Sequence, residues 1–321
     1  MLAMELRTIQ SARPSNNSLS TDYSRIGLSP FIKWAGGKSS LIDHLLPFVP
    51  LRLSNYYEPF LGGGALFLAI CGRSTKFNAF LSDTNRDLIN AFMIVKTRPF
   101  DLIRRLARLR SEYKATRSKE DYYYDRRGWK PRTLLDLAAR FIFLNKTCYN
   151  GLYRVNPRGV FNVPFGHHKN PRIFDEENIN RISRALKDTH TRLNAVDYKK
   201  STAKCGPGDL VYLDPPYHPS SRTASFTDYT PNGFVQEDQE ELVEVFSQLV
   251  DRGCLVLQSN SDTHLIRDLY RGHRVQSLLV NRPINCIGTE RRGFKELIIL
   301  GIPTRNRSRH RLKHYSQTIL S

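Results

Sequence analysis

The chain is poor in several features, and each shortage excludes a class of protein. It has five cysteines in 321 residues, and they are far apart with no C-x-x-C pair. That spacing argues against a zinc module and a disulfide framework, and it indicates a reduced, intracellular setting. No apolar run approaches the roughly 20 residues that span a bilayer, and no charged region followed by an apolar region opens the chain. We therefore expect a soluble, cytoplasmic protein without a membrane partner.

Acidic residues are also scarce relative to basic ones. Asp and Glu number 30 against 49 for Lys and Arg, which leaves a formal net charge of +19. An excess spread over many segments suits a surface that binds a polyanion, so nucleic acid is the first partner to consider. A merely basic, soluble protein is the alternative. With 40% hydrophobic residues, the chain can bury the core of one large domain with an insertion, or of two modest domains.

The pattern along the chain predicts a core domain, an insertion and two tails. Residues 1–27 are rich in Ser and Asn and lack periodicity, and residues 303–321 form a basic tail. Strand-like and helical stretches alternate over residues 28–96 and again over 193–302, which predicts a mainly parallel sheet. Residues 97–192 are basic and helical, and they contain Asn-Pro-Arg-Gly between two strand-like runs, a hairpin signature. We predict that this stretch is an insertion.

A glycine cluster indicates a ligand that approaches the backbone closely. In EPFLGGGALFLAI, three glycines stand between a short strand and an apolar helix. Asp83 ends the next strand, 19 positions after Gly64, near the spacing at which doubly wound folds place a carboxylate on ribose hydroxyls. The pair favours an adenosine-containing cofactor, and a tight turn with a helix-capping Asp is the alternative. FIKWAGGKSS resembles a Walker A loop, but Ile32 stands where that loop needs its first glycine, so we reject an NTPase.

A second strand ends at an unusual tetrad. The stretch that begins at Gly208 reads as a buried strand and stops at Asp214-Pro215-Pro216-Tyr217. In a parallel sheet, such a strand end faces the ligand crevice. A proline amide has no N–H, so the Pro215 carbonyl is offered without a competing donor beside it. That carbonyl and the Asp214 carboxylate form a pair of acceptors suited to an amine, while Tyr217 can stack on a flat base. An ordinary proline-rich turn is the alternative.

Six stretches together closely resemble the Dam-type, alpha-class DNA adenine-N6 methyltransferases. They are FIKWAGGK, EPFLGGGALF, LSDTNRDLINAF, NKTCYNGLYRVNPRGVFNVPFG, LDPPY and INCIGTERRGFKELIIL. The resemblance covers roughly residues 28–302, in the alpha-class order, and excludes both tails. Related tetrads of glutamine methyltransferases usually begin with Asn, and those of cytosine-N4 enzymes begin with Ser, so Asp214 favours adenine.

The resemblance implies a fold and a reaction. The fold is α/β, a Rossmann-like S-adenosylmethionine-dependent methyltransferase sheet with an inserted helical and β-hairpin DNA-recognition domain. The reaction transfers a methyl group from S-adenosylmethionine to the N6 amine of adenine in double-stranded DNA. A catalytically silent DNA-binding protein of the same fold is one alternative. An RNA or protein methyltransferase is another, although the basic hairpin insertion suits duplex DNA better.

The resemblance also implies site residues. Those expected to hold the cofactor are Trp34, Ala35, Gly36, Lys38, Phe60, Gly62, Gly64, Asp83, Asp197 and Asp214. The catalytic set is Asp214, Pro215, Pro216 and Tyr217, with Tyr217 stacked on an adenine flipped out of the duplex. The residues expected to read DNA are Lys33, beside the cofactor motif, and five residues of the hairpin: Tyr149, Asn150, Leu152 and Arg154 on its first arm and Pro164 on its second. No metal is implied, and we expect His167 and His168 to face DNA or solvent.

The recognition residues predict the target sequence. The five hairpin residues match the GATC-reading pattern, with Arg154 as the side chain that reads a guanine. Departures around KTC and HHKN leave a longer or altered site open. The same motifs serve solitary methylases, phage enzymes and partners of restriction endonucleases. We expect a monomer that acts at the nucleoid, with a cognate restriction endonuclease as one potential genetic partner.

Overall fold

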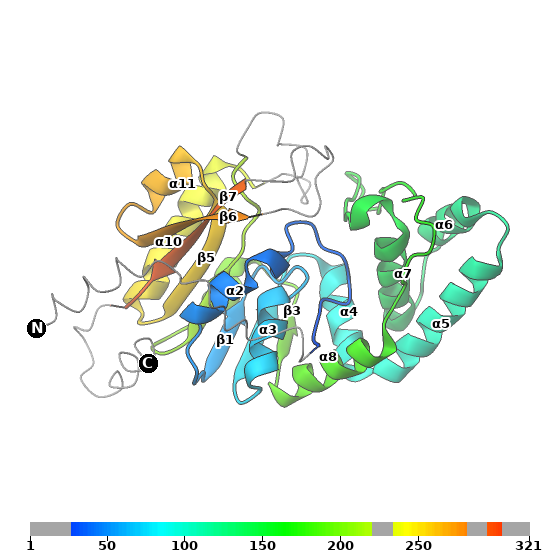
Figure 1. Cartoon of the computed structure of the whole chain (residues 1–321), viewed down its shortest axis with the longest axis horizontal. Helices are drawn as coiled ribbons and strands as arrows, with labels where there is room; N and C mark the ends of the chain where they lie inside the picture. Colours follow the sequence, from blue (N-terminus) through cyan, green and yellow to red (C-terminus); the bar gives the residue numbers. More distant parts are fainter. Residues whose placement is uncertain (1–26, 220–233, 281–293, 304–321) are drawn as a thin grey trace, which may run out of the picture.

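The computed structural model describes residues 27–219, 234–280 and 294–303 (Figure 1). The predicted tails therefore lie outside the described residues, except for Gly27 and Pro303. In Figure 1 a twisted sheet with its covering helices lies beside a second group of helices.

A seven-stranded sheet forms the centre of the larger part. The strands are β1 (Asn55–Glu58), β2 (Asn78–Ser82), β3 (Arg192–Asn194), β4 (Leu210–Leu213), β5 (Leu255–Ser261), β6 (Arg274–Val280) and β7 (Phe294–Gly301). Their order is β3-β2-β1-β4-β5-β7-β6. The first five are parallel, and β7 runs antiparallel to both of its neighbours. The predicted α/β class and mainly parallel, Rossmann-like sheet are confirmed.

The central strands are covered on both faces. All four side chains of β4 are buried, as expected where helices cover both sides of a parallel sheet. Successive residues alternate between two buried clusters, with Tyr212 in one and Val211 in the other. Strand β5 is also buried throughout, although four of its seven residues are polar. Polar groups in a covered strand need buried partners, and the partners of Ser259 and Asn260 belong to the site described below.

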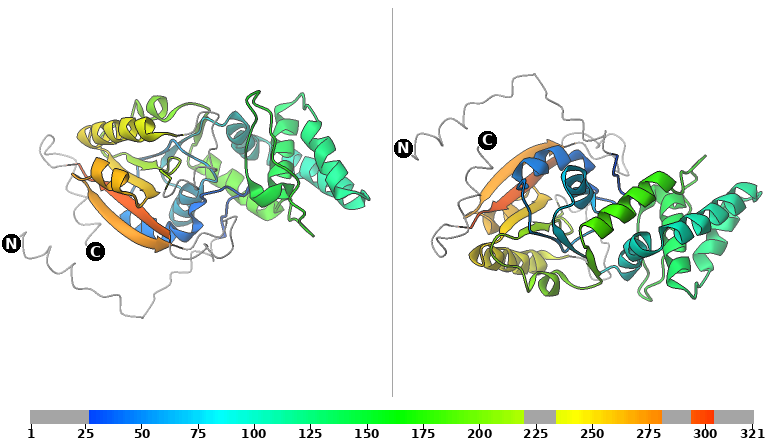
Figure 2. Two further views of the ribbon diagram at one scale, coloured as in Figure 1. Left: turned by 90° about the horizontal axis from the view of Figure 1, so that it is seen from above. Right: turned by 90° about the horizontal axis from the view of Figure 1, so that it is seen from below.

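Helices lie on both faces of the sheet (Figure 2). They are η2 (Lys38–Ser40), α2 (Ile42–Leu45), η3 (Leu46–Phe48), α3 (Ala65–Arg73), α4 (Arg86–Thr97), α9 (Tyr198–Thr202), α10 (Gln236–Asp251) and α11 (His264–Leu269). In α4, the predicted apolar stripe of Leu88, Phe92 and Val95 is fully buried. Asn85 begins this helix, because its side chain accepts a hydrogen bond from the Leu88 N–H. No helix of the described part is long and apolar enough to cross a bilayer.

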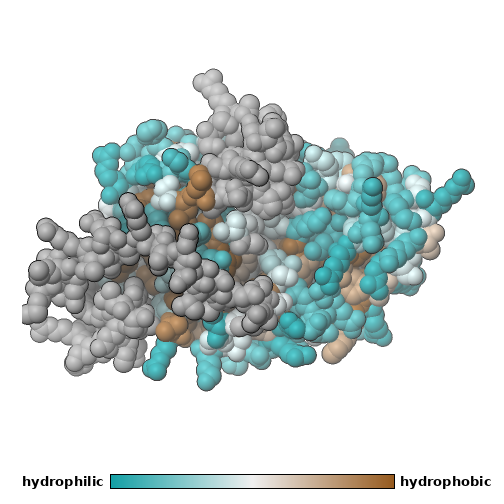
Figure 3. Space-filling model, in the orientation of Figure 1, coloured by the Kyte–Doolittle hydropathy of each residue, from teal (hydrophilic) through white to brown (hydrophobic). Residues whose placement is uncertain are grey.

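The helical group is formed by the chain between β2 and β3. Besides α4, this fully described stretch forms α5 (Pro99–Ala115), α6 (Lys119–Gly128), α7 (Leu134–Thr147), η4 (Tyr149–Gly151) and α8 (Glu176–Asp188), and it adds no strand to the sheet. One cluster of buried side chains contains Phe67 beside the sheet together with Leu106 and Ile142 of the helices. The core therefore continues into this group, and the boundaries 97–192 stay a prediction. Figure 3 shows a largely hydrophilic surface over the helical side.

After α7 the chain folds back on itself, where the sequence predicts a hairpin. Val155 forms an isolated antiparallel bridge with Phe161, and Cys148 forms another with Phe165. The chain turns between Val155 and Phe161, where the Gly159 N–H donates a hydrogen bond to the Asn156 carbonyl at 2.8 Å. Pairing is thus limited to isolated bridges and does not build a regular ladder.

The expectation that Tyr149 and Asn150 lie on a strand arm is wrong. Both residues belong to the 3₁₀ turn η4. Asn150 has φ 52° and Gly151 has φ 66°, which are left-handed conformations. An extended arm cannot continue through two such residues.

Candidate active site

The sheet brings the two predicted motifs to one place. The chain continues from β1 to β2 on one side of the sheet, and from β4 to β5 on the other, so the strand order reverses between β1 and β4. The carboxyl ends of the strands at such a switch point border the crevice in which α/β sheets bind ligands. The glycine cluster follows β1 and the Asp-Pro-Pro-Tyr tetrad follows β4.

The glycine cluster packs against Trp34. Gly62 and Gly64 have φ of 47° and 68°, in the left-handed region that glycine adopts without strain. A Cβ on Gly62 would lie 2.8 Å from Cδ1 of Trp34. The Asp83 carboxylate accepts hydrogen bonds from the backbone N–H groups of Gly62 at 3.1 Å and Asn85 at 2.9 Å. Burial raises the pKa of Asp83, and these hydrogen bonds oppose the rise.

Asp214 contacts residues of the cofactor loop, a name we use for residues 33–38. Its side chain is 18% exposed, and its Oδ1 lies 2.9 Å from Lys38 Nζ. Ser259 Oγ donates to the same oxygen at 2.7 Å. Burial raises the pKa of Asp214, while the Lys38 charge and the Ser259 hydrogen bond lower it. Lys38 Nζ also lies 4.4 Å from the centroid of the Tyr217 ring, so one lysine contacts both ends of the tetrad.

Three side chains that the sequence analysis did not single out hold the tetrad. Glu296 Oε2 accepts a hydrogen bond from the Tyr217 hydroxyl at 2.8 Å. Gln239 Nε2 donates to the Pro216 carbonyl at 3.0 Å, and Asn260 Nδ2 in turn donates to Gln239 Oε1 at 2.9 Å. Two features of the sequence could have indicated such residues: the polar run QSNS in an otherwise apolar strand, and the single acidic residue in FKELIIL.

Glu58, the last residue of β1, was also missed. Its side chain is buried at 2% exposure, and its Oε2 accepts a hydrogen bond from the Tyr56 hydroxyl at 2.9 Å. Burial raises the pKa of Glu58 to about 8, and the charge of Asp214 adds to the rise. This carboxyl is therefore mostly protonated at neutral pH.

The remaining predicted cofactor residues surround the glycine cluster. Phe60 stacks on Tyr198 with ring centroids 5.3 Å apart, which brings α9 to this cluster. Asp197 begins α9, and its Oδ1 accepts a hydrogen bond from the Lys199 N–H at 2.8 Å. That bond accounts for Asp197 as a helix cap, so its cofactor contact stays a prediction. Ala35 and Gly36 belong to the cofactor loop, and the Gly36 carbonyl accepts a hydrogen bond from Lys38 at 2.6 Å.

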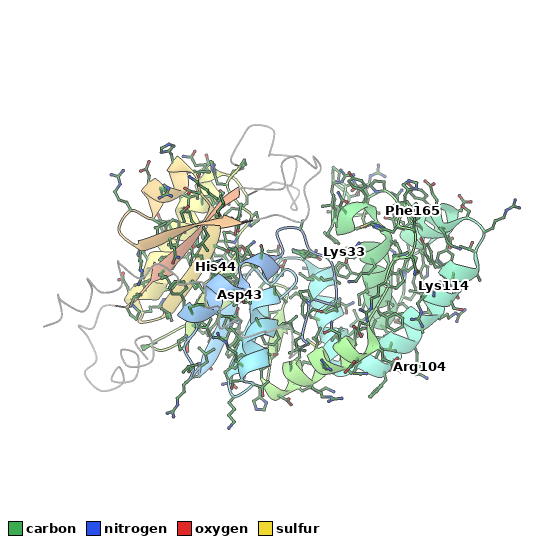
Figure 4. All side chains as sticks on the ribbon, in the orientation of Figure 1. Lys33, Asp43, His44, Arg104, Lys114 and Phe165 are labelled. Carbon is green, nitrogen blue, oxygen red and sulfur yellow. The ribbon has the colours of Figure 1, made fainter. Side chains whose placement is uncertain are left out.

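Apart from Lys33, the predicted DNA-reading residues lie on residues 149–164, which we call the recognition segment. Tyr149, Arg154 and Pro164 are exposed, and the Tyr149 N–H donates to the Pro164 carbonyl at 2.9 Å. Arg154 Nε donates to Asn162 Oδ1 at 2.8 Å, which holds the guanidinium on the exposed side. Leu152 is partly buried against the core. Figure 4 shows Lys33 between the sheet and the helical group.

The two adjacent histidines stand next to the recognition segment. His168 Nε2 lies 3.0 Å from the Cys148 carbonyl oxygen. His167 is exposed, as expected, and its ring meets that of Phe165 edge to face. Among the residues that the structure describes, no three His, Cys, Asp or Glu side chains are grouped so that they could hold a metal ion.

The strand order, with the glycine cluster and the tetrad at the carboxyl ends of β1 and β4, gives a Rossmann-like fold, and a match to a family model makes this protein a methyltransferase of that fold. More narrowly, the chain belongs to the D12 class N6 adenine-specific DNA methyltransferases, whose family model matches residues 34–282. The predicted family and enzyme class are confirmed.

Three relatives are similar to this protein over most of the chain. The type II methyltransferase M.MjaIII of Methanocaldococcus jannaschii is 37% identical over 287 residues, which are 85% of this chain and 99% of the relative. The type II methyltransferase M1.LlaDCHI of Lactococcus lactis is 36% identical over 281 residues, 86% of this chain and 96% of the relative. The DNA adenine methylase of Escherichia coli is 38% identical over 275 residues, 85% of this chain and 95% of the relative.

Proposed function

We propose that the protein transfers a methyl group from S-adenosylmethionine to the N6 amine of adenine within GATC in double-stranded DNA. The observation that carries the proposal is the contact of Lys38 with Asp214, because it joins the cofactor loop to the tetrad assigned to the amine. The family description and the name of the Escherichia coli relative support adenine in DNA as the substrate. The methyl donor, the site residues and the target sequence are the proposed elements.

The residues present suit S-adenosylmethionine. Asp83 is a carboxylate that already accepts two N–H bonds, and ribose hydroxyls offer donors of the same kind. Gly62 and Gly64 permit a close approach to the backbone, and Phe60 offers apolar surface for an adenosine. When bound there, the cofactor would supply an electrophilic methyl group.

The tetrad would hold and orient the amine. Asp214 and the Pro215 carbonyl accept the two N–H bonds, which draws the nitrogen lone pair out of conjugation with the ring. Lys38 and Ser259 both contact Oδ1 of Asp214, so they fix the carboxylate, and we assign its other oxygen to the amine. Flipping the base costs a few kcal/mol. Stacking on Tyr217 recovers part of that cost.

The recognition segment would read the target. Arg154 can make a bidentate contact to guanine O6 and N7. Leu152 and Pro164 contact thymine methyl groups, and Tyr149 and Asn150 fill the gap left by the flipped adenine. Lys33, the first residue of the cofactor loop, contacts DNA near the reacting base. The exposure of Tyr149 and the Asn162 bond to Arg154 support these roles.

Expression in a host that lacks adenine methylation tests the reaction and the site together. The DNA is challenged with endonucleases that cut only methylated, or only unmethylated, GATC. We expect full conversion at GATC. Methyladenine at other sequences with GATC left unmodified would overturn the site and keep the chemistry, and DNA without methyladenine would overturn the proposed activity.

Arg154→Ala tests the guanine contact. We expect a loss of about 1–3 kcal/mol of discrimination at one guanine, measured as methylation rates on duplexes that vary that base. Arg158→Ala is the matched control, because Arg158 is exposed in the same segment. A uniform loss on every duplex would show that Arg154 contacts phosphate instead.

The biological setting is proposed from the relatives alone. The type II names of M.MjaIII and M1.LlaDCHI favour a restriction-modification role with a cognate endonuclease encoded nearby. We propose that the enzyme acts as a monomer at the nucleoid. Sequencing of neighbouring genes and sedimentation of the purified protein test these two points.

A further inference from the structure

One buried side chain joins the cofactor loop to the recognition segment. Asn145, in the last turn of α7, is 2% exposed. Its Oδ1 accepts a hydrogen bond from the Lys33 N–H at 2.8 Å. Its Nδ2 donates to the Lys33 carbonyl at 2.7 Å and to the Gly151 carbonyl at 3.0 Å. A fully bonded amide in a core holds its partners firmly, because breaking any of these bonds leaves a buried polar group unsatisfied.

The backbone of Gly151 also packs closely against the side chain of Lys33. A Cβ on Gly151 would lie 2.4 Å from Lys33 Cβ, and the φ of Gly151 is +66°. Both the close contact and the left-handed conformation require a glycine at this position. Because Gly151 has no side chain, a displacement of its backbone acts directly on Lys33.

Trp34 forms a second connection. Its ring stacks on Tyr153 of the recognition segment, with centroids 6.0 Å apart and planes inclined by 24°. The same indole is the group that a Cβ on Gly62 would strike. One residue next to Lys33 therefore contacts both the recognition segment and the glycine cluster.

We infer that Asn145 is a positioning residue that couples DNA binding at the recognition segment to cofactor binding at the loop. DNA that orders the turn around Gly151 orders Lys33 and Trp34 through the amide, and an occupied cofactor loop orders the turn by the same bonds. The coupling is reciprocal, so the cofactor tightens DNA by the same factor as DNA tightens the cofactor. The inference rests on the proposed function, since it requires these two ligands at these two segments.

The test is a thermodynamic cycle on the full chain. The Kd of a GATC duplex is measured with and without S-adenosylhomocysteine, which has no methyl group to transfer, and the ratio is the coupling factor. We expect a factor of about 5 or more for the wild type, within the usual range of roughly 5- to 150-fold. Asn145→Asp keeps the size and the acceptor for the Lys33 N–H but loses both amide donor bonds. We expect its coupling factor to fall to about one.

Asn178→Asp is the matched control. Asn178 is also buried, at 6% exposure, and it makes the same pair of bonds to one backbone unit, accepting from the Ser29 N–H at 3.2 Å and donating to the Ser29 carbonyl at 2.8 Å. This variant should keep the wild-type coupling factor. A wild type that binds both ligands with a factor of one overturns the inference, as does a folded Asn145→Asp protein that keeps the factor, or an Asn178→Asp protein that loses it equally. A wild type that binds neither ligand overturns the proposed function itself.

A second measurement leaves Asn145 unchanged, so it holds even where the variant does not fold. Trp34 and Trp129 are the two tryptophans of the chain, and Trp129→Phe leaves Trp34 as the only indole reporter. We expect a saturating duplex, without cofactor, to change the Trp34 emission, and S-adenosylhomocysteine to shift the duplex titration midpoint by the coupling factor. An emission that stays constant on addition of duplex would contradict the coupling.

Discussion

Charged side chains gather in two parts of the molecule, in opposite surroundings. At the carboxyl edge of the sheet, Lys38 and Asp214 pair with side-chain exposures of 8% and 18%. Along α5, Arg104 pairs with Asp101 while 80% exposed, and Arg108 pairs with a glutamate while 69% exposed. Figure 4 shows Arg104 and Lys114 on α5, away from Lys33 and the sheet.

The surroundings change what each charge does. Burial raises the pKa of Asp214 despite its lysine partner, whereas hydrogen bonds from Arg104 and Arg98 lower the pKa of the surface residue Asp101. Water screens the surface pairs, so each contributes little to stability. At the sheet edge the dielectric is lower, so the charges of Lys38 and Asp214 interact more strongly and hold each other in place. The first region is suited to chemistry, and the second supplies a hydrophilic, basic surface.

Asp214→Asn should have the largest effect. We expect single-turnover methyl transfer to fall about 10²-fold or more, because an acceptor for the reacting amine is lost, while the Kd for duplex changes by only a few fold. The control is Asp209→Asn, since Asp209 is buried at the other end of β4, where it accepts hydrogen bonds from Asn55 and Gly206. A variant that keeps more than about a tenth of the rate would remove Asp214 from the catalytic set.

Glu58→Gln compares a buried carboxyl with a surface carboxyl through the pH dependence of stability. The folded protein keeps the Glu58 proton up to about pH 8, whereas an unperturbed glutamate loses it near pH 4.5. The wild type therefore loses stability as pH rises through this window, by about 1.4 kcal/mol per pH unit from this group. The variant lacks this dependence. Its free energy of unfolding, measured in urea, should therefore increase relative to that of the wild type from pH 5 to pH 8. Glu120→Gln, on the exposed face of α6, is the control, and parallel curves for Glu58→Gln and the wild type would contradict the raised pKa of Glu58.

Tyr217→Phe should have a smaller effect. The ring that stacks on the base remains, and the hydrogen bond to Glu296 is lost. One such bond contributes about 1 kcal/mol, so we expect a roughly fivefold lower transfer rate at saturating duplex. Tyr124→Phe, on the surface of α6, is the control. An unchanged rate would show that Glu296 does not position the ring.

Arg108→Ala should have the smallest effect. Its ion pair with Glu112 is exposed, and Glu112 keeps the hydrogen bond from the Tyr122 hydroxyl at 2.7 Å. We expect the urea midpoint of unfolding to match that of the wild type, with methyl transfer unaffected. A clearly lower midpoint would mean that α5 depends on its surface pairs in the way the sheet edge depends on its buried ones.

The sequence by itself determined the features that depend on neighbours along the chain. The stripe of Leu88, Phe92 and Val95 follows from helical periodicity, and the left-handed turn at Gly62 follows from the only residue type that adopts it without strain. The end of β4 at Asp214 follows from two prolines. The parallel sheet, and with it the meeting of both motifs at one edge, follows from the alternation of strands and helices.

Only the tertiary structure decided which individual side chains, far apart in the sequence, contact one another. Asn145 binds the backbone of a residue 112 positions away, and Glu296 accepts a hydrogen bond from Tyr217 across 79 positions. The turn at Asn150, where the sequence predicts a strand arm, is likewise set by packing against the cofactor loop. A buried polar group must find its partner among whatever the fold places beside it, and that neighbour depends on strand order and helix packing rather than on adjacent residues.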